Sequence, residues 1–347
     1  MSIVISDEYG KRVDYGKYKI YYVHGRTDEE RQFIVFPERR KKCLHSNREY
    51  ERNLLYERSH GKYKAVGIFC HRITLSYIFS IYYEGYSGTF YPKNQYNSGR
   101  LIVKQVEAYD NSREVIAKAI VCGIGRNIYE VLYHYYKHDK KEVKEVLDWI
   151  RREFYVKVEN AQNVKEIMAA EGEVWMRFYG TFQYFLPEDF VMNKRVKRPP
   201  DNPINALISY GNTLLYTKTI SAIYQTHLDQ RISFLHEPSE GRFSLSLDMS
   251  EVFKPVIVYR TIFDLVNNRK LQVEKHFDKK VNYCLLNEEG RKIFIEAFEA
   301  RMESVFVHDR LKRKVTYRTA LKLDCYKLIK YILEGQEFIP FSLKNNR

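Results

Sequence analysis

The spacing of apolar residues changes near Leu101, and this change limits the folds that the chain can adopt. Before it, runs rich in aromatic and β-branched residues at 18–23, 32–36 and 65–69 are typical of β-strands. After it, apolar residues recur every three to four positions, as on the buried face of a helix. The pattern predicts an α+β protein, with a small N-terminal β domain over 1–100 and a larger all-α domain over 101–347.

Local start signals place several helices of the second domain. Asn111, with Glu114 three residues later, forms a capping-box pattern that predicts a helix start. Asn202 followed by Pro203 is a second start signal, because proline suits the first helical turn. The apolar spacing predicts further helices at about 141–152, 163–180, 248–268, 289–304 and 316–334. The stretch 38–63 carries many charges and little periodicity, which predicts a loop or an insertion.

Composition narrows the class of protein. The chain has 347 residues, of which 44% are hydrophobic, enough for two domains with cores of their own. No uncharged apolar run is long enough to span a membrane, and charged residues such as Asp7 and Lys11 argue against a signal peptide. The five cysteines are scattered and form no CxxC pair, which argues against a zinc ribbon or a disulfide framework. We therefore expect a soluble, cytoplasmic protein.

Basic residues outnumber acidic ones, 58 to 44, which gives a net charge of +14. Such an excess favours a polyanionic partner such as DNA, although it could also serve solubility alone. Two clusters are candidate contacts for a DNA backbone. The first precedes Pro199 and the second follows residue 310; a solvated linker and an exposed helix face are the alternatives. The predicted DNA-binding residues are Lys194, Arg195, Lys197 and Arg198 in the first cluster and Lys312, Arg313, Lys314 and Arg318 in the second.

Glu171 lies in the predicted helix at 163–180, on the face expected to be buried. That face is read from the spacing of Val164, Met168, Trp175 and Tyr179. A carboxylate on an apolar stripe costs free energy unless it is paired or bound to a metal ion. Glu171 is thus a candidate metal ligand, and a glutamate paired with a lysine or arginine is the alternative.

His236, Asp248 and Glu251 complete a candidate metal site. His236 has apolar neighbours and could equally be a hydrogen-bonded core histidine. Asp248 and Glu251 are three residues apart, which puts both on one face of a helix, where acids could also stabilise the helix dipole. Two or three carboxylates with one imidazole suit Mg²⁺ or Mn²⁺ better than a structural zinc ion. Spacing alone leaves open whether these groups converge.

Four motifs in order resemble those of the CRISPR-associated integrase family, the adaptation nuclease of CRISPR systems. The run IMAAEG at 167–172 resembles its "EG" helix, and NALISYGNTLL at 205–215 resembles a second helix motif. LHEP at 235–238 resembles its histidine motif, and SLDMSEVFKP at 246–255 resembles its "LDLMEPFRP" motif. The resemblance covers about three quarters of the chain. Asn212 stands where the family commonly has an aromatic residue, and 24–63 matches the family poorly.

The resemblance implies both a fold and roles for residues. It implies a β-sandwich-like N-terminal domain that joins a homodimer and a helical catalytic C-terminal domain. The family's metal ligands fall on Glu171, His236 and Glu251, with Asp248 as a supporting acid and Lys254 beside the scissile phosphate. It also implies assembly with a small companion protein of CRISPR adaptation. The expected activity is metal-dependent endonuclease and integrase chemistry that inserts short foreign DNA into a repeat array.

Other functions remain open at the level of sequence. A homologous integrase of a mobile element would use the same chemistry outside a CRISPR locus. A non-catalytic DNA-binding scaffold would bind duplex DNA with a steep salt dependence and be indifferent to metal chelators. A phosphodiesterase acting on RNA or small nucleotides is more remote from the motifs.

Overall fold

The computed structural model describes residues 99–343, apart from 193, 198, 241, 281, 282, 309 and 310, together with the backbone of six strands nearer the N-terminus. The chain divides into two compact units, Met1–Gln95 and Tyr96–Arg347, each with its own internal packing. Of the loop predicted at 38–63, residues 38–62 lie outside the described part. Arg198, predicted to bind DNA, also lies outside it.

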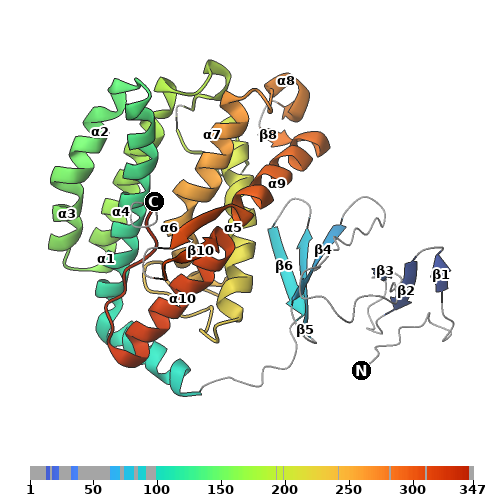
Figure 1. The fold of residues 1–347 in the computed structure, drawn as a ribbon, viewed down its shortest axis with the longest axis horizontal. Helices are drawn as coiled ribbons and strands as arrows, with labels where there is room; N and C mark the ends of the chain where they lie inside the picture. The colour runs from blue at the N-terminus through green and yellow to red at the C-terminus, as the bar shows by residue number, and fades with distance from the viewer. Residues whose placement is uncertain are drawn as a thin grey trace. The chain divides into compact units, whose positions relative to one another are not determined.

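The strands of the first unit form two antiparallel sheets of three strands each (Figure 1). Strands β2, β3 and β4 occupy the three runs in which the sequence predicts strands. The β5–β6 register shifts between Phe79 and Ser80, which is typical of a β-bulge. That these sheets form one domain for dimerisation stays a prediction. The strands are β1 (Val13–Tyr15), β2 (Tyr18–Tyr22), β3 (Phe33–Pro37), β4 (Tyr63–Cys70), β5 (Thr74–Ile81) and β6 (Gly85–Phe90).

The second unit is largely helical. The α-helices are α1 (Gly99–Lys137), α2 (Lys144–Trp149), α3 (Tyr155–Asn160), α4 (Val164–Gly180), α5 (Pro203–Tyr224), α6 (Ser244–Lys254), α7 (Arg260–Asn267), α8 (Val273–His276), α9 (Glu288–Glu303) and α10 (Tyr317–Glu334). The 3₁₀ segments are η1 (Lys141–Val143), η3 (Phe182–Tyr184) and η4 (Glu188–Phe190), and the π-helical segments are η2 (Ile150–Phe154) and η5 (Pro255–Tyr259).

Two β-hairpins contradict the prediction that this domain is entirely α-helical. Strands β7 (Phe277–Lys280) and β8 (Tyr283–Leu286) form one antiparallel pair, and β9 (Val305–His308) and β10 (Arg313–Thr316) form the other. Each strand has only four residues. Such short runs are too brief to show the two-residue alternation that identifies a strand in a sequence.

Helix α1 begins twelve residues earlier than the capping pattern at Asn111 predicts. Leu101, Gln105 and Ala108 extend its buried face towards the N-terminus. The Asn111 side chain donates a hydrogen bond to the Glu107 carbonyl at 2.9 Å, a bond that fits inside a helix rather than at its start. The start predicted for α5 is confirmed, because the Asn202 side chain accepts a hydrogen bond from the Asn205 amide at 2.9 Å.

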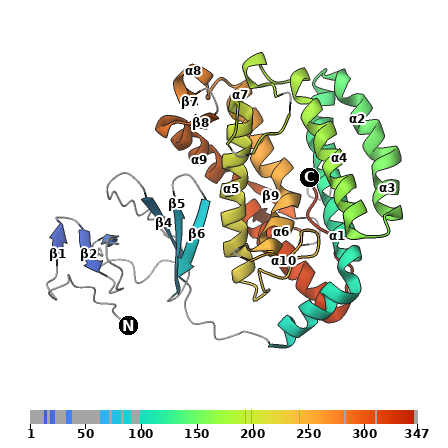
Figure 2. The same ribbon diagram turned by 180° about the vertical axis from the view of Figure 1, so that it is seen from behind.

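The core of the helical unit lies where α1 packs on α4 and α6, and α6 on α5. Figures 1 and 2 show α2 and α3 on the outside of this unit, beside α1 and α4. Ile120, Ile124 and Ile128 of α1 are fully buried, as is Phe178 of α4. Burying each such side chain contributes about 1.5 to 3 kcal/mol. This packing places α4, which carries Glu171, and α6, which carries Glu251, against the same helix.

Helix α6 gives way to the π-helical segment η5 at Pro255. Proline has no amide hydrogen to donate to the carbonyl four residues earlier, so the regular bonding pattern is interrupted there. The chain continues through η5 into α7, with Val256, Ile257 and Tyr259 all buried. The change of helix type fixes the C-terminal end of α6 just after Lys254.

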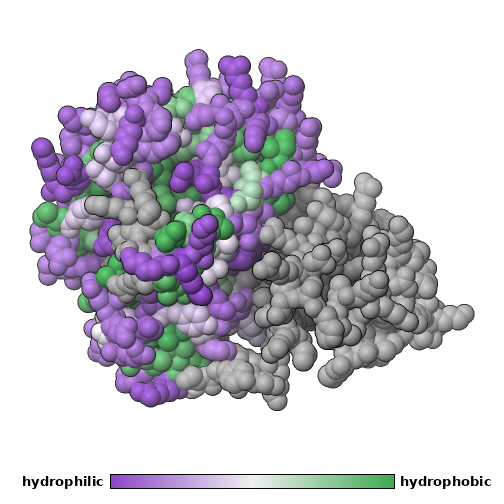
Figure 3. Space-filling model, viewed as in Figure 1, coloured by the Kyte–Doolittle hydropathy of each residue, from purple (hydrophilic) through white to green (hydrophobic). Residues whose placement is uncertain are grey.

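The described surface is mostly hydrophilic on the face drawn in Figure 3, with small separate hydrophobic areas. Among the residues that the structure describes, no helix has the length and the apolar character needed to cross a membrane.

Candidate active site

The predicted histidine lies in a connection between α5 and α6 that is built of turns and bends. Asp248, on the first turns of α6, shapes this connection from inside the protein. Its carboxylate is fully buried and accepts hydrogen bonds from the amides of Phe234 at 2.6 Å, Leu235 at 2.9 Å and His236 at 3.0 Å. Three successive amides on one carboxylate hold the backbone around His236 in a single conformation.

The same carboxylate orients the His236 ring. His236 Nδ1 lies 2.8 Å from Asp248 Oδ1, and the imidazole is 23% exposed. A carboxylate offers about four acceptor positions, and Asp248 uses them on three amides and one ring nitrogen. An ionised carboxylate only accepts, so Nδ1 carries the hydrogen of a neutral ring and Nε2 keeps its lone pair.

Charges around His236 raise the pKa of its imidazole above the usual value. Burial by itself would lower that pKa. The hydrogen bond and negative charge of Asp248 more than offset burial, helped by the charges of Glu251 and Glu171. The ring therefore lies within the field of both predicted carboxylate ligands.

Glu251 follows Asp248 by one helical turn and is 6% exposed. Its Oε1 atom pairs with the ammonium of Lys254, which lies one turn further along α6. The two side chains are 7% and 15% exposed, so this ion pair is largely screened from water by protein. The order of residues along α6 is thus a buried acid, then a paired acid, then the lysine that pairs with it.

Glu171 lies on α4 and is half-buried. The sequence places it on the correct helix, and Val164 and Trp175 of the predicted face are buried. Met168 is 37% exposed, however, while Ile167, Ala170 and Val174 are buried. Spacings of three and four residues fit both faces, so periodicity does not separate them. Glu171 therefore lies at the edge of the apolar face, where it keeps some contact with solvent.

The surroundings of Glu171 raise the pKa of its carboxyl to about 7. Burial is the largest cause, and repulsion from Glu251 adds to it. Lys254, His236 and a hydrogen bond from Trp175 act in the opposite direction. Glu171, His236 and Glu251 thus influence one another, although they come from α4, the α5–α6 connection and α6. The sequence places Trp175 on the buried face but does not reveal its hydrogen bond to Glu171, since an indole on such a face resembles an ordinary core residue.

The chemical types of the donor groups at this site fit a divalent metal ion, but their positions do not form a coordination sphere. Across the part of the chain that the structure describes, no three histidine, cysteine or acidic side chains are gathered closely enough to hold an ion as they stand. The Lys254 ammonium lies against Glu251 instead. Two carboxylates and an imidazole nitrogen suit Mg²⁺ or Mn²⁺.

A pair of hydrogen-bonded tyrosines lies beside this site; the sequence places Tyr179 on the buried face but does not indicate its partner. The hydroxyls of Tyr179 on α4 and Tyr259 in η5 are 2.7 Å apart. Burial raises the pKa of both phenols, and the charges of Arg195 and Glu251 act on both. Both tyrosines therefore stay protonated at neutral pH and tie α4 to the segment that follows α6.

The first predicted basic cluster is partly bound to α5. Arg195 donates from Nη1 to Asn205 Oδ1 at 3.0 Å and from Nη2 to Ser209 Oγ at 2.9 Å. Asn205 in turn donates from Nδ2 to the Lys194 carbonyl at 3.0 Å. Lys194 and Lys197 are exposed. The buried asparagine of the NALISYGNTLL run thus anchors this segment.

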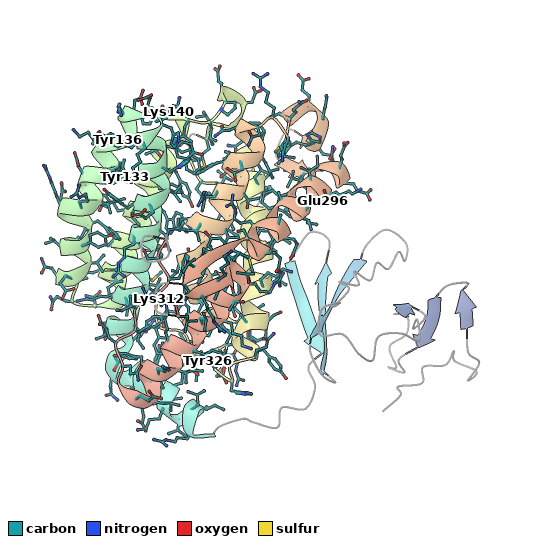
Figure 4. All side chains as sticks on the ribbon, in the orientation of Figure 1. Tyr133, Tyr136, Lys140, Glu296, Lys312 and Tyr326 are labelled. Carbon is teal, nitrogen blue, oxygen red and sulfur yellow. The ribbon has the colours of Figure 1, made fainter. Side chains whose placement is uncertain are left out.

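The second basic cluster divides in a similar way. Lys312, Arg313 and Lys314 are exposed on the β9–β10 hairpin, and Figure 4 marks Lys312 at its turn. Arg318, at the start of α10, donates to Glu303 at 2.6 Å and to Glu299 at 2.8 Å. Arg318 therefore joins α10 to α9.

Comparison with known proteins adds an independent observation. A family model described as CRISPR associated protein Cas1 matches residues 31–300. The chain belongs to this Cas1 family. The CRISPR-associated endonuclease Cas1 of Fusobacterium nucleatum is 42% identical over 264 residues, which cover 76% of this chain and 77% of the relative. All the residues predicted at the metal site lie inside the matched range.

Two solved structures are similar to this Cas1-family chain. A CAS1 protein from Thermotoga maritima has a TM-score of 0.62 and 38% identity, covering 73% of this chain and 77% of that one. A chain in a partial Cas6-RT-Cas1–Cas2 complex has a TM-score of 0.64 and 21% identity, covering 74% of this chain and 78% of that one. At that identity the second likeness shows the fold alone.

Proposed function

We propose that this Cas1-family chain is the endonuclease and integrase of a CRISPR adaptation system, and that it inserts short foreign DNA at a repeat array. Membership of the family makes it an enzyme that acts on DNA. One observation carries the assignment of the site. Glu171, His236 and Glu251, which match the family's motifs, interact electrostatically although they come from three separate segments.

We propose that these three residues hold Mg²⁺ or Mn²⁺. The ion would polarise the attacked phosphate and stabilise the charge that develops on the departing oxygen. His236 offers the lone pair of Nε2, because its Nδ1–H donates a hydrogen bond to Asp248. Asp248 is a positioning residue in this scheme, since its acceptor positions are already used.

The proposed reaction is a transesterification at the boundary of a repeat. The 3′-hydroxyl of a prespacer strand attacks the phosphorus and loses its proton, and a new phosphodiester bond forms. The bond from phosphorus to the departing 3′-oxygen breaks, and that oxygen takes up a proton. Lys254 lies beside Glu251 and can stabilise negative charge on the phosphate.

The exposed basic residues are the proposed DNA contacts. Lys194 and Lys197 extend from the segment that Asn205 anchors, and Lys312, Arg313 and Lys314 extend from the hairpin. The same prediction for Arg198 stays untested. Arg195 and Arg318 would have to exchange bonds within the protein for contacts with phosphate.

We also propose a homodimer that assembles with a small companion protein and works in the cytoplasm. The similar structure of a Cas6-RT-Cas1–Cas2 complex supports a Cas2-like companion. Co-purification with the companion, followed by measurement of the mass of the complex, tests this proposal.

Release of a branched strand from a DNA intermediate, with Mn²⁺, tests the catalytic assignment. We expect His236→Ala and Glu251→Ala to abolish the reaction and EDTA to stop the wild-type protein. Glu173→Ala serves as a control, because Glu173 lies two residues from Glu171 on α4 but pairs with Lys157 and Arg177. Wild-type rates in the His236 and Glu251 variants would contradict the assignment. Activity that persists in EDTA would contradict the metal.

The rival assignment to a mobile element uses the same chemistry and therefore needs a different test. The identity of 42% is to proteins named as CRISPR-associated, which favours the CRISPR assignment. An integration assay can compare a leader–repeat junction with unrelated DNA of the same length. We expect insertion at the junction, and indifference to the repeat would favour the rival.

A further inference from the structure

We infer that Gln105 and Arg113, both on α1, are positioning residues for His236, because they anchor the two ends of the segment that carries it. This inference rests on the proposed function, since it takes His236 as a metal ligand. The segment, residues 229–237, runs between α5 and α6 without a helix or a strand of its own. Its order therefore depends on side chains that reach it from elsewhere.

Gln105 anchors the beginning of the segment. The side chain is fully buried, its Oε1 accepts from the Asp229 amide at 2.9 Å, and its Nε2 donates to the carbonyls of Asp229 at 2.9 Å and Ile232 at 3.0 Å. An amide side chain has both the acceptor and the two donors that this set of bonds needs. A glutamate of the same size would face the two carbonyls with an acceptor, so only glutamine satisfies all three partners.

Arg113 anchors the end of the segment, on both sides of His236. Its Nε donates to the Phe234 carbonyl at 2.9 Å, two residues before the histidine. Its Nη2 donates to Glu237 at 2.7 Å, one residue after it. The Tyr109 hydroxyl accepts from Nη1 at 3.0 Å, and the guanidinium lies over the Tyr109 ring. A lysine in place of Arg113 would keep the charge but lose this forked pattern of bonds.

The two anchors complement Asp248. Asp248 on α6 binds the amides of residues 234–236, and the α1 side chains bind the segment at 229, 232, 234 and 237. Helix α1 also packs against α4, which carries Glu171, and against α6, which carries Glu251. The same helix therefore contacts every element that supplies a proposed ligand. Removing an α1 anchor should loosen His236 relative to the two carboxylates while the packed core remains.

Gln105→Glu and Arg113→Lys in the full-length protein test the inference. The first measurement is direct Mn²⁺ binding, followed through the electron paramagnetic resonance signal of free Mn²⁺. The second is the Mn²⁺ concentration that gives half-maximal release of a branched DNA strand. We expect the Mn²⁺ dissociation constant and the Mn²⁺ concentration for half-maximal strand release both to rise by about 10- to 100-fold, as for other residues that orient metal ligands. The rate at saturating Mn²⁺ should recover towards the wild-type value.

Lys118→Gln is the matched control. Lys118 is also on α1 and also donates to a backbone carbonyl of another segment, that of Glu159 on α3, at 2.6 Å. It touches no part of 229–237 among the described contacts, so we expect unchanged Mn²⁺ binding. Circular dichroism and thermal unfolding show whether each variant is folded. Arg113→Lys, at a position 14% exposed, keeps the test available should Gln105→Glu fail to fold.

The possible outcomes separate this inference from the proposed function. Wild-type Mn²⁺ affinity in a folded Arg113→Lys protein would overturn the inference. A lower maximal rate with an unchanged Mn²⁺ requirement would overturn it too, since a purely structural role gives that result. His236→Ala is measured beside them. If His236→Ala also binds Mn²⁺ and reacts like the wild type, the proposed function fails. If His236→Ala loses Mn²⁺ binding and strand release while the Gln105 and Arg113 variants keep them, only the inference fails.

Discussion

Glu171 keeps its proton close to neutral pH because burial and the nearby charge of Glu251 raise its pKa to about 7. A metal ion that binds this carboxylate must displace the proton. Below pH 7 the proton competes with the metal, so metal affinity should fall as the pH falls. The raised pKa of His236 acts in the same direction, because a protonated imidazole is no ligand.

We predict that the Mn²⁺ dissociation constant increases by about tenfold or more from pH 8 to pH 6. Isothermal titration calorimetry in two buffers of different ionisation enthalpy gives both the affinity and the number of protons released. Glu173→Gln should show the same pH dependence as the wild-type protein. An affinity that is constant between pH 6 and pH 8 would contradict a role for Glu171 and His236 as ligands.

The raised pKa of Glu171 also has a consequence for stability without metal. Between the unfolded pKa of about 4.5 and the folded pKa of about 7, the folded protein binds more protons than the unfolded chain. The free energy of unfolding therefore falls as the pH rises through this window. Glu171→Gln removes the charge and keeps an acceptor for Trp175. It should stabilise the metal-free protein at pH 8 by about 1 to 2 kcal/mol, less than the full shift implies because Glu171 keeps some solvent contact.

Glu173→Gln should have the opposite sign. Hydrogen bonds and charges from Lys157 and Arg177 lower the pKa of Glu173, so its charged form stabilises the fold above the unfolded pKa. Urea unfolding in EDTA at pH 8 and at pH 4 measures both variants. We expect the Glu171 variant to gain stability only at pH 8 and the Glu173 variant to lose it there. A destabilised Glu171→Gln protein at pH 8 would refute this account, in which the site is unfavourable for folding until metal binds.

At the scale of elements, helix α6 carries two acids with different roles, Asp248 and Glu251, on successive turns. Asp248 organises the connection that carries His236, and Glu251 is the proposed ligand. Asp248→Asn would bring an NH₂ group towards donors that need an acceptor. We expect it to destabilise the fold by about 2 to 4 kcal/mol and to abolish strand transfer.

Glu251→Gln should abolish strand transfer but destabilise the fold by less than Asp248→Asn does, because it breaks a single ion pair and also relieves the repulsion between Glu251 and Glu171. Urea unfolding curves beside branched-strand release separate the two variants. Equal losses of stability in both would show that the two acids do not divide the work as the hydrogen bonds indicate.

The sequence predicts the helices of the site but not the contacts that join them. Helical spacing and start signals place α4 and α5, because the information is local to each helix. The bonds from Gln105 to Asp229 and Ile232 join residues more than 120 positions apart, which no local pattern encodes. A glutamine on the buried stripe between Leu101 and Ala108 is the one signal that a polar partner must exist. The ligand roles came from motif resemblance rather than from residue chemistry.

At the scale of the whole molecule, the net charge of +14 has to be assigned to particular surfaces. The basic residues differ in how exposed their side chains are. Arg195 is bound to α5, and Arg318 is held between Glu299 and Glu303. Lys312, at the turn of the hairpin, and Arg313 and Lys314, on β10, are exposed. These positions should contribute unequally to DNA binding.

Log affinity for duplex DNA falls linearly with log salt concentration, and each phosphate contact that is lost makes this slope shallower by about 0.9. The triple variant Lys312→Gln, Arg313→Gln, Lys314→Gln should therefore reduce that slope by about 2 to 3 and weaken binding at low salt. Its unfolding should stay close to wild type, because exposed side chains contribute little to stability. Arg318→Gln should destabilise the fold and leave the slope close to wild type. It breaks two ion pairs between α9 and α10, and the charge that it removes is already engaged within the protein. Fluorescence anisotropy of labelled duplex DNA across a salt series measures the slopes. A triple variant with the wild-type slope would remove the hairpin from the DNA-binding surface and leave the first basic cluster as its main candidate.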